Sequence, residues 1–212
     1  MLDVLSAGEL HSQYQRMADR LIDENPHAVY PTSPYRASDG KVIDSDDCTH
    51  VEAVMTSKTY TSIRITEGVL EPDDNQLRSI YSPLGRCVCF IDKNVDEILG
   101  KRVANYFHHH HIKLEKLSYR AMEVDKGTAT VESMLGDLKR LGVSRNEPVL
   151  IIGGGVLSDT GGLACGLYHR GTPYVMLSTS LVAGIDAGPS PRTCCDGFGY
   201  KNLFGAYHAP IL

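Results

Sequence analysis

The sequence predicts an α/β protein with a doubly wound, mostly parallel sheet of the Rossmann-like kind. Short apolar runs at 87–91 and 149–152 are typical of strands buried on both faces of a sheet. Apolar residues at three- and four-residue steps in 94–107 and 131–141 indicate amphipathic helices that alternate with the strands. Such alternation favours parallel strands, whose ligands lie beyond their carboxyl ends.

The N-terminal quarter of the chain is predicted to form an extension over residues 1–56, before an α/β domain over 57–212. Apolar residues recur with helical spacing from Leu10 to Leu21, and Pro26 ends the pattern. The following stretch to Thr56 is rich in Pro, Ser, Asp and Gly and predicts a loop or linker. Alternation over Tyr60–Thr66 predicts a first strand, and a short strand is also expected around 112–117.

Composition excludes several function classes. The 212 residues include 21 basic and 26 acidic side chains, a net charge of −5, which gives no support for nucleic-acid or membrane-surface binding. No apolar run approaches the roughly 20 residues that span a bilayer, and the N-terminus lacks a signal peptide's basic start, so a cytoplasmic location is expected. The six cysteines form no C-x-x-C pair, which predicts reduced thiols rather than structural zinc.

Three consecutive glycines, 153–155, follow the apolar run at 149–152. Helical spacing resumes from Val156, so these glycines lie between the end of a strand and the start of a helix. Glycine lets an anion approach the backbone, and a helix N-terminus offers N–H donors and partial positive charge. The turn therefore predicts a pyrophosphate cradle, although Ser158 breaks the G-x-G-x-x-G pattern and a plain tight turn is the alternative.

Polar residues accumulate in the Gly-, Ala- and Leu-rich stretch after the glycines. Carboxylates, cations, an amide and an imidazole are costly to bury unpaired, so they either face water or converge on a polar ligand. The set comprises Asp159, Arg170, Asp186, Arg192, Lys201, Asn202 and His208.

The run His108–His111 raises the possibility of a metal site, which the sequence does not favour. Consecutive histidines at a helix end cannot all face one point, and no Cys or carboxylate stands at ligand spacing beside them. A solvated helix C-terminus is the preferred interpretation, and no metal ligand is predicted in this chain.

Several motifs resemble, in order and spacing, those of the sugar phosphate cyclases, the family of 3-dehydroquinate synthase. They cover roughly residues 85–212. The motifs are Gly-Gly-Gly-Val-x-x-Asp at 153–159, Tyr-x-Arg-Gly at 168–171, Ser-Thr-Ser-Leu-Val-x-x-Ile-Asp at 178–186 and Lys-Asn-x-x-Gly-Ala-Tyr-His at 201–208. The resemblance implies an NAD-binding α/β domain, with the helical domain that holds the family's divalent metal, zinc or cobalt, absent from these residues.

The resemblance also implies which residues contact NAD. Asp92, at the end of an early strand, matches an acid that binds the adenosine ribose, with a helix N-cap as the alternative role. Glu123 and Lys126 match a Glu-x-x-Lys motif on the adenosine side, with an exposed ion pair as the alternative. The remaining expected contacts, to the pyrophosphate and the nicotinamide end, are Gly154, Gly155, Val156, Asp159, Thr179, Ser180 and Asp186.

Four residues are implied at the substrate: Arg170, Lys201, Asn202 and Arg192. Guanidinium, ammonium and amide groups can donate hydrogen bonds to the phosphate and hydroxyl groups of a sugar phosphate. Arg192 stands where the family usually has Lys. Because a guanidinium cannot be deprotonated, phosphate binding by Arg192 is expected to survive better than proton transfer.

The family's reaction is NAD-dependent: an alcohol is oxidised, phosphate is eliminated, the ketone is reduced back, and an intramolecular aldol addition closes the ring. The enzyme is thus expected to be a carbon–oxygen lyase acting on phosphates, and a homodimer at full length. The ending Gly205–Pro210 favours the branch that cyclises sedoheptulose 7-phosphate to valiolone-type cyclitols, with 3-dehydroquinate synthase as the alternative. A non-catalytic NAD-binding fragment stays open, and residues 1–212 alone are expected to be inactive.

Overall fold

The computed structural model describes residues 38–44, 51–57 and 60–212, which fall into two compact units, Met1–Thr59 and Tyr60–Leu212. In the first unit, β1 (Ser38–Asp44) and β2 (Val51–Ser57) form an antiparallel hairpin. The loop expected up to Thr56 is therefore wrong over these two strands. Backbone pairing needs no continuous apolar run, so composition concealed the hairpin. The helix predicted within residues 1–26 lies outside the described residues.

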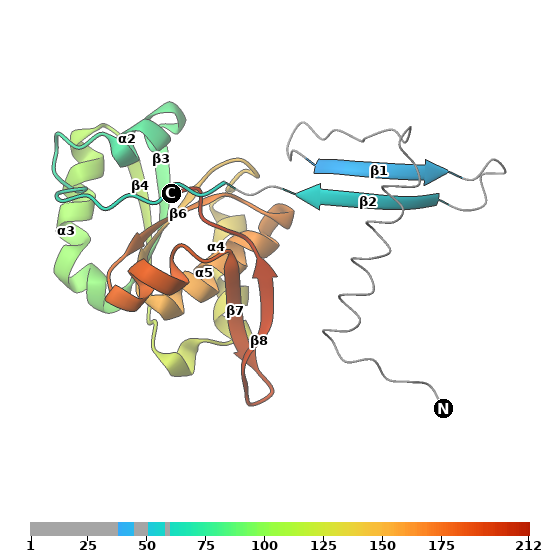
Figure 1. The fold of residues 1–212 in the computed structure, drawn as a ribbon. Helices are drawn as coiled ribbons and strands as arrows, with labels where there is room; N and C mark the ends of the chain where they lie inside the picture. Colours follow the sequence, from blue (N-terminus) through green and yellow to red (C-terminus); the bar gives the residue numbers. More distant parts are fainter. Residues whose placement is uncertain (1–37, 45–50, 58–59) are drawn as a thin grey trace. The chain divides into compact units, whose positions relative to one another are not determined.

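The second unit contains a four-stranded sheet whose order is β4-β3-β5-β6, and every neighbouring pair is parallel. This confirms the predicted doubly wound parallel sheet. The chain leaves β3 outward to β4 and then returns past β3 to β5, so the strand order reverses between β3 and β5 (Figure 1). The strands are β3 (Arg86–Asp92), β4 (Lys113–Tyr119), β5 (Val149–Gly153) and β6 (Tyr174–Ser178).

Helices cover both faces of this sheet because its strands are apolar on both sides. Cys87, Cys89 and Ile91 pack with α2 and α3, whereas Val88 and Phe90 pack with α4 and α5. Figure 1 shows α3 on one side of the strands and α4 with α5 on the other. The helices are α2 (Gln76–Tyr81), α3 (Lys93–His109), α4 (Thr128–Arg140) and α5 (Gly155–Leu167).

Two glycines inside α5 bring this helix close to its neighbours. A Cβ on Gly162 would lie 2.5 Å from Thr193 Cγ2 on β7, and one on Gly161 would lie 3.0 Å from Ile151 Cδ1 on β5. The β7–β8 hairpin therefore packs directly on α5, and this contact brings residues 192–207 toward the end of the sheet. The remaining elements are η1 (Ser82–Leu84), η2 (Glu123–Asp125), η3 (Tyr168–Arg170), η4 (Ala183–Ala187), β7 (Arg192–Gly197) and β8 (Tyr200–Tyr207).

The strand predicted over Tyr60–Thr66 is absent: this segment has no regular structure. The free edge of β6 is already bonded by the last residues of the chain, through Ile211 N to Tyr174 O (2.9 Å) and Met176 N to Leu212 O (2.8 Å). The segment 60–66 meets these last residues and not β6, through one backbone bond from Ser62 N to Ile211 O (3.2 Å). None of the helices in the described part of the chain is long and apolar enough to cross a membrane.

Candidate cofactor and substrate site

The glycine turn lies where β5 ends and α5 begins. Gly154 is the extended residue before α5, and no side chain caps this helix start. A Cβ on Gly154 would meet Ser180 Oγ at 3.5 Å, and Thr179 N donates to Gly153 O at 2.9 Å. The structure thus brings together the glycines, Thr179 and Ser180, which the sequence placed in separate motifs. Backbone donors of the first turn of α5 are available to an anion here.

Lys126 forms the polar junction of the site. Its Nζ lies 2.6 Å from Asp159 Oδ2 and donates to Asn202 Oδ1 at 2.7 Å, so it joins a predicted cofactor residue to a predicted substrate residue. Only 8% of the Lys126 side chain is exposed. Burial alone would lower the pKa of Lys126, but the hydrogen bond and charge of Asp159 outweigh burial and raise that pKa. Lys126 is therefore a fixed cation at neutral pH.

A second ion pair joins Lys201 to Glu123, with Nζ and Oε1 2.7 Å apart. Both side chains are exposed, 75% for Lys201 and 54% for Glu123. Solvent screening makes such a pair worth little to stability. It does place the Lys201 ammonium beside η2, and the Glu123 hydrogen bond and charge raise the pKa of Lys201. Two predicted cofactor residues thus each contact a predicted substrate residue.

A cavity of about 460 Å³ opens beside this junction, a size that suits a small polar ligand. Four predicted residues contribute to its wall, namely Asp159, Asp186, Arg192 and Asn202. The other lining residues are Ala187, Ser190, Thr193, Cys194, Gly205, Ala206 and Tyr207.

Asp92 adopts the alternative role that its position allowed. Its Oδ1 accepts from the backbone N–H of Asn94 (2.8 Å) and of Val95 (3.4 Å), so it is the N-cap of α3. It also stands at the carboxyl end of β3, at the edge of the sheet that carries the glycine turn. A ribose contact by Asp92 stays a prediction, and so does a cofactor contact by Val156, which is half-buried in the first turn of α5.

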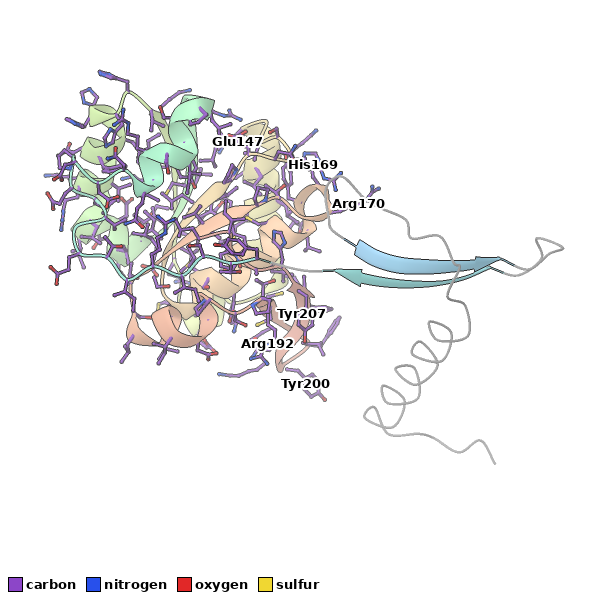
Figure 2. The ribbon with its side chains drawn as sticks, turned by 45° about the horizontal axis from the view of Figure 1, so that its top comes forward. Glu147, His169, Arg170, Arg192, Tyr200 and Tyr207 are labelled. Atoms are coloured by element: carbon purple, nitrogen blue, oxygen red, sulfur yellow. The ribbon has the colours of Figure 1, made fainter. Side chains whose placement is uncertain are left out.

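Arg170 is a predicted substrate residue that lies far from both the glycine turn and the cavity. It follows the C-terminal end of α5, while the glycine turn precedes the N-terminal end. Thirteen helical residues separate the two ends by about 20 Å. Figure 2 shows His169 and Arg170 apart from Arg192 and Tyr207. His169 (φ 51°) and Arg170 (φ 63°) both have left-handed backbones, a strained arrangement for non-glycine residues.

The histidine run ends α3 without forming a metal site. The His110 ring packs edge-on against Tyr106, with ring centroids 4.6 Å apart, and burial lowers the pKa of His110. In residues 38–44, 51–57 and 60–212, no three His, Cys, Asp or Glu side chains come together in a way that could hold a metal ion.

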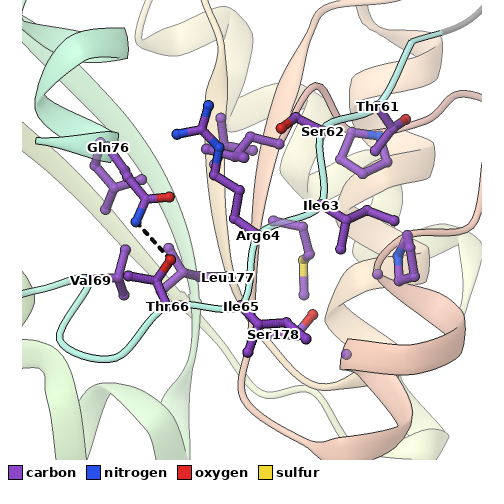
Figure 3. A pocket seen from close by; sticks show the side chains of 18 residues that line it. Thr61, Ser62, Ile63, Arg64, Ile65, Thr66, Val69, Gln76, Leu177 and Ser178 are labelled. Carbon is purple, nitrogen blue, oxygen red and sulfur yellow. Dashed lines mark hydrogen bonds between the residues drawn. The ribbon is translucent and has the colours of Figure 1, made fainter.

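A separate cavity of about 310 Å³ lies at the β6 edge of the sheet, under the irregular segment 61–66 (Figure 3). Gln76 Nε2 donates to Thr66 Oγ1 at 2.9 Å, and both residues line the cavity. Predicted site residues are missing from its lining, which is mostly apolar and includes Ile63, Ile65 and Leu177.

Asp196 belongs to the site and was missed from the sequence. Its carboxylate accepts from Asn202 N at 2.7 Å, and its own N–H donates to Lys126 O at 2.7 Å. A bulge between Cys195 and Gly197 places it there. Bulges leave little trace in a sequence pattern, and the two glycines around Phe198 were the available signal.

Comparison with known proteins shows which family part of the chain resembles. Residues 116–212 match the N-terminal family of 3-dehydroquinate synthase. Over this part, the chain is similar in sequence to sugar phosphate cyclases. The demethyl-4-deoxygadusol synthase of Trichormus variabilis is 32% identical over 160 residues, which are 76% of this chain and 38% of that enzyme.

Solved structures agree with this relationship. A 2-epi-5-epi-valiolone synthase from Streptomyces hygroscopicus, solved with NAD⁺ and Zn²⁺ bound, superimposes with a TM-score of 0.69 at 31% identity over 73% of this chain and 42% of that one. A 2-deoxy-scyllo-inosose synthase complexed with carbaglucose-6-phosphate, NAD⁺ and Co²⁺ gives a TM-score of 0.54 at 25% identity over 59% and 34%. The chain spans about two fifths of the length of the curated relatives that it matches.

Proposed function

We propose that this chain is the NAD-binding part of a sugar phosphate cyclase, a lyase that eliminates phosphate and closes a carbon ring. The Lys126 junction is the observation that supports this most. One buried ammonium contacts Asp159 on the predicted cofactor side and Asn202 on the predicted substrate side, at the wall of one cavity. Two related enzymes were solved with NAD⁺ and a divalent metal, and one of them with a sugar phosphate analogue.

The residues present fit NAD. The uncapped start of α5, with Gly154 and Gly155 before it, offers backbone N–H groups and partial positive charge to a pyrophosphate. Asp159 and Thr179 stand close enough to the turn to accept from or donate to ribose hydroxyls. When bound, NAD supplies reversible oxidation of an alcohol, which acidifies the neighbouring C–H.

The protein's own contribution in this proposal is orientation and charge. Arg192 and Lys201 are cations at or beside the cavity, suited to a phosphate, and the amide of Asn202 can bind a sugar hydroxyl. Lys126 keeps Asn202 and Asp159 in fixed positions, so that the sugar and the cofactor meet in one geometry.

We propose sedoheptulose 7-phosphate as the substrate, because the Gly205–Pro210 ending favours that branch and valiolone-type and deoxygadusol synthases are among the relatives. In a full-length enzyme carrying these residues, kcat/KM for sedoheptulose 7-phosphate is expected to exceed that for the precursor of 3-dehydroquinate by at least about tenfold. Phosphate release with each sugar measures this, and Lys201→Ala should abolish it. The reverse preference would favour 3-dehydroquinate synthase, and NAD binding without turnover of either sugar would favour the non-catalytic alternative.

We further propose a homodimer in which Arg170 of one subunit serves the site of the other. Arg170 stands about 20 Å from the turn of its own chain, yet the family motif assigns it to the substrate phosphate. The backbone of Arg170 is left-handed, which is strained for a non-glycine residue. Such strain is found mainly at functional sites, which supports a functional role for Arg170.

Subunit mixing tests the dimer proposal. Arg170→Ala and Lys201→Ala full-length enzymes are each expected to lose at least about tenfold in kcat/KM, because each lacks one charged contact to the phosphate. A mixed dimer keeps one intact site, so mixing should restore up to about a quarter of wild-type turnover under this shared-site scheme. Mixtures no more active than the separate variants would show that Arg170 does not act across subunits.

A further inference from the structure

Asp196 holds two segments of the site at once. Its backbone N–H donates to Lys126 O (2.7 Å), and Gly127 pairs with Asp196 as an isolated bridge. Its Oδ1 accepts from the backbone N–H of Asn202, also at 2.7 Å. One residue of β7 is thus bonded to the segment that carries Lys126 and to the strand that carries Asn202.

The bond to Asn202 fixes an unusual backbone. Asn202 has φ 53°, in the left-handed region, inside strand β8. Asparagine tolerates this conformation better than most residues, but a strand offers it no regular backbone partner there. The Asp196 carboxylate supplies that partner. In this conformation the Asn202 side-chain oxygen accepts from Lys126 Nζ.

We propose that Asp196 is a positioning residue that aligns Lys126 with Asn202, and thereby the cofactor side of the site with the substrate side. Asp196 is not among the residues that line the cavity, so it acts through the two residues that it holds. The inference rests on the proposed function only in assigning Lys126 to the cofactor and Asn202 to the sugar. The bonds through which Asp196 holds them are independent of that assignment.

Calorimetric titration of the 212-residue chain with NAD tests the alignment. Asp196→Ala keeps the backbone bond to Lys126 O but removes the carboxylate that holds Asn202 N–H, so Asn202 no longer holds the Lys126 ammonium in place. NAD binding is therefore expected to weaken about tenfold, a loss comparable to one charge-assisted hydrogen bond. Asp196→Asn should recover affinity to within about threefold, because an amide oxygen accepts the same N–H. Wild-type affinity in Asp196→Ala would overturn the proposal.

Asp137→Ala is the matched control. Asp137 is also a half-buried carboxylate that accepts a side-chain hydrogen bond, from Tyr119 OH at 2.6 Å, but it lies on α4 outside the cavity. The Asp137→Ala variant should have a lower melting temperature than the wild type and an unchanged NAD affinity. If Asp196→Ala also lowered only the melting temperature, Asp196 would stabilise the β7–β8 hairpin without positioning the site.

If the wild-type chain binds no NAD, the proposed function is refuted. The positioning role of Asp196 can still be tested then, by a double-mutant cycle that measures thermal stability. Glycine adopts positive φ without support, so Asn202→Gly removes the need for the Asp196 bond. Asp196→Ala is therefore expected to lower the melting temperature at least about twice as much in the wild type as in Asn202→Gly. Equal shifts, or an alanine variant that fails to fold in both backgrounds, would overturn the proposal, whereas folding of Asp196→Ala in Asn202→Gly alone would support it.

Discussion

Residues 1–212 produced alone are expected to bind NAD but to release phosphate from sedoheptulose 7-phosphate at least about 10⁴-fold more slowly than the Streptomyces hygroscopicus valiolone synthase assayed beside them. The related structures hold a divalent metal, whereas no metal-binding group is present among the described residues. Without a Lewis acid, the alcohol to be oxidised is not activated. A cleft open to water also weakens each charged contact in it.

Phosphate release with NAD and added zinc or cobalt is the measurement for this first expectation. Turnover above background that vanishes in Lys201→Ala would show that these residues form a complete site. Lys101→Ala is the matched control, because Lys101 is an exposed lysine on α3 that takes no part in the cavity. Loss of turnover in that variant would indicate a general effect of removing positive charge.

Gly154→Val is expected to weaken NAD binding at least about 100-fold, which corresponds to roughly 2.7 kcal/mol. Gly154 has φ −90°, a conformation open to any residue, and its nearest neighbour, Ser180 Oγ, would lie 3.5 Å from an added Cβ. Alanine should therefore fit the fold, and the two methyl groups of valine should fill the space where the pyrophosphate approaches the turn.

Titration calorimetry and thermal unfolding separate binding from folding in this second case. Gly136→Ala is the control, because Gly136 lies on the exposed side of α4 and an added Cβ would meet nothing within 4 Å. It should bind NAD as the wild type does and be slightly more stable. An unchanged NAD affinity in folded Gly154→Val would contradict the glycine cradle.

The sequence by itself determined the sheet and the edge at which the predicted ligand-binding residues of β3 and β5 stand. Apolar runs and helical stripes are local patterns, so they located β3, β5, α4 and α5 within a few residues. The glycines after β5 and Asp92 after β3 then had to stand at one edge, since the carboxyl ends of parallel strands meet there. The helix cap, which was the alternative role for Asp92, followed from the same local position.

Only the tertiary structure decided how residues distant in sequence combine. Lys126 and Asn202 are 76 positions apart, and their contact depends on Gly162 of α5, which lets the β7–β8 hairpin approach. Asp196 enters the site through a bulge, and Tyr60–Thr66 loses its strand because the chain's last residues occupy the edge of β6. Arg170 is kept from the cavity by the length of α5. Periodicity records which face of an element is buried, whereas these outcomes depend on which other segment covers that face.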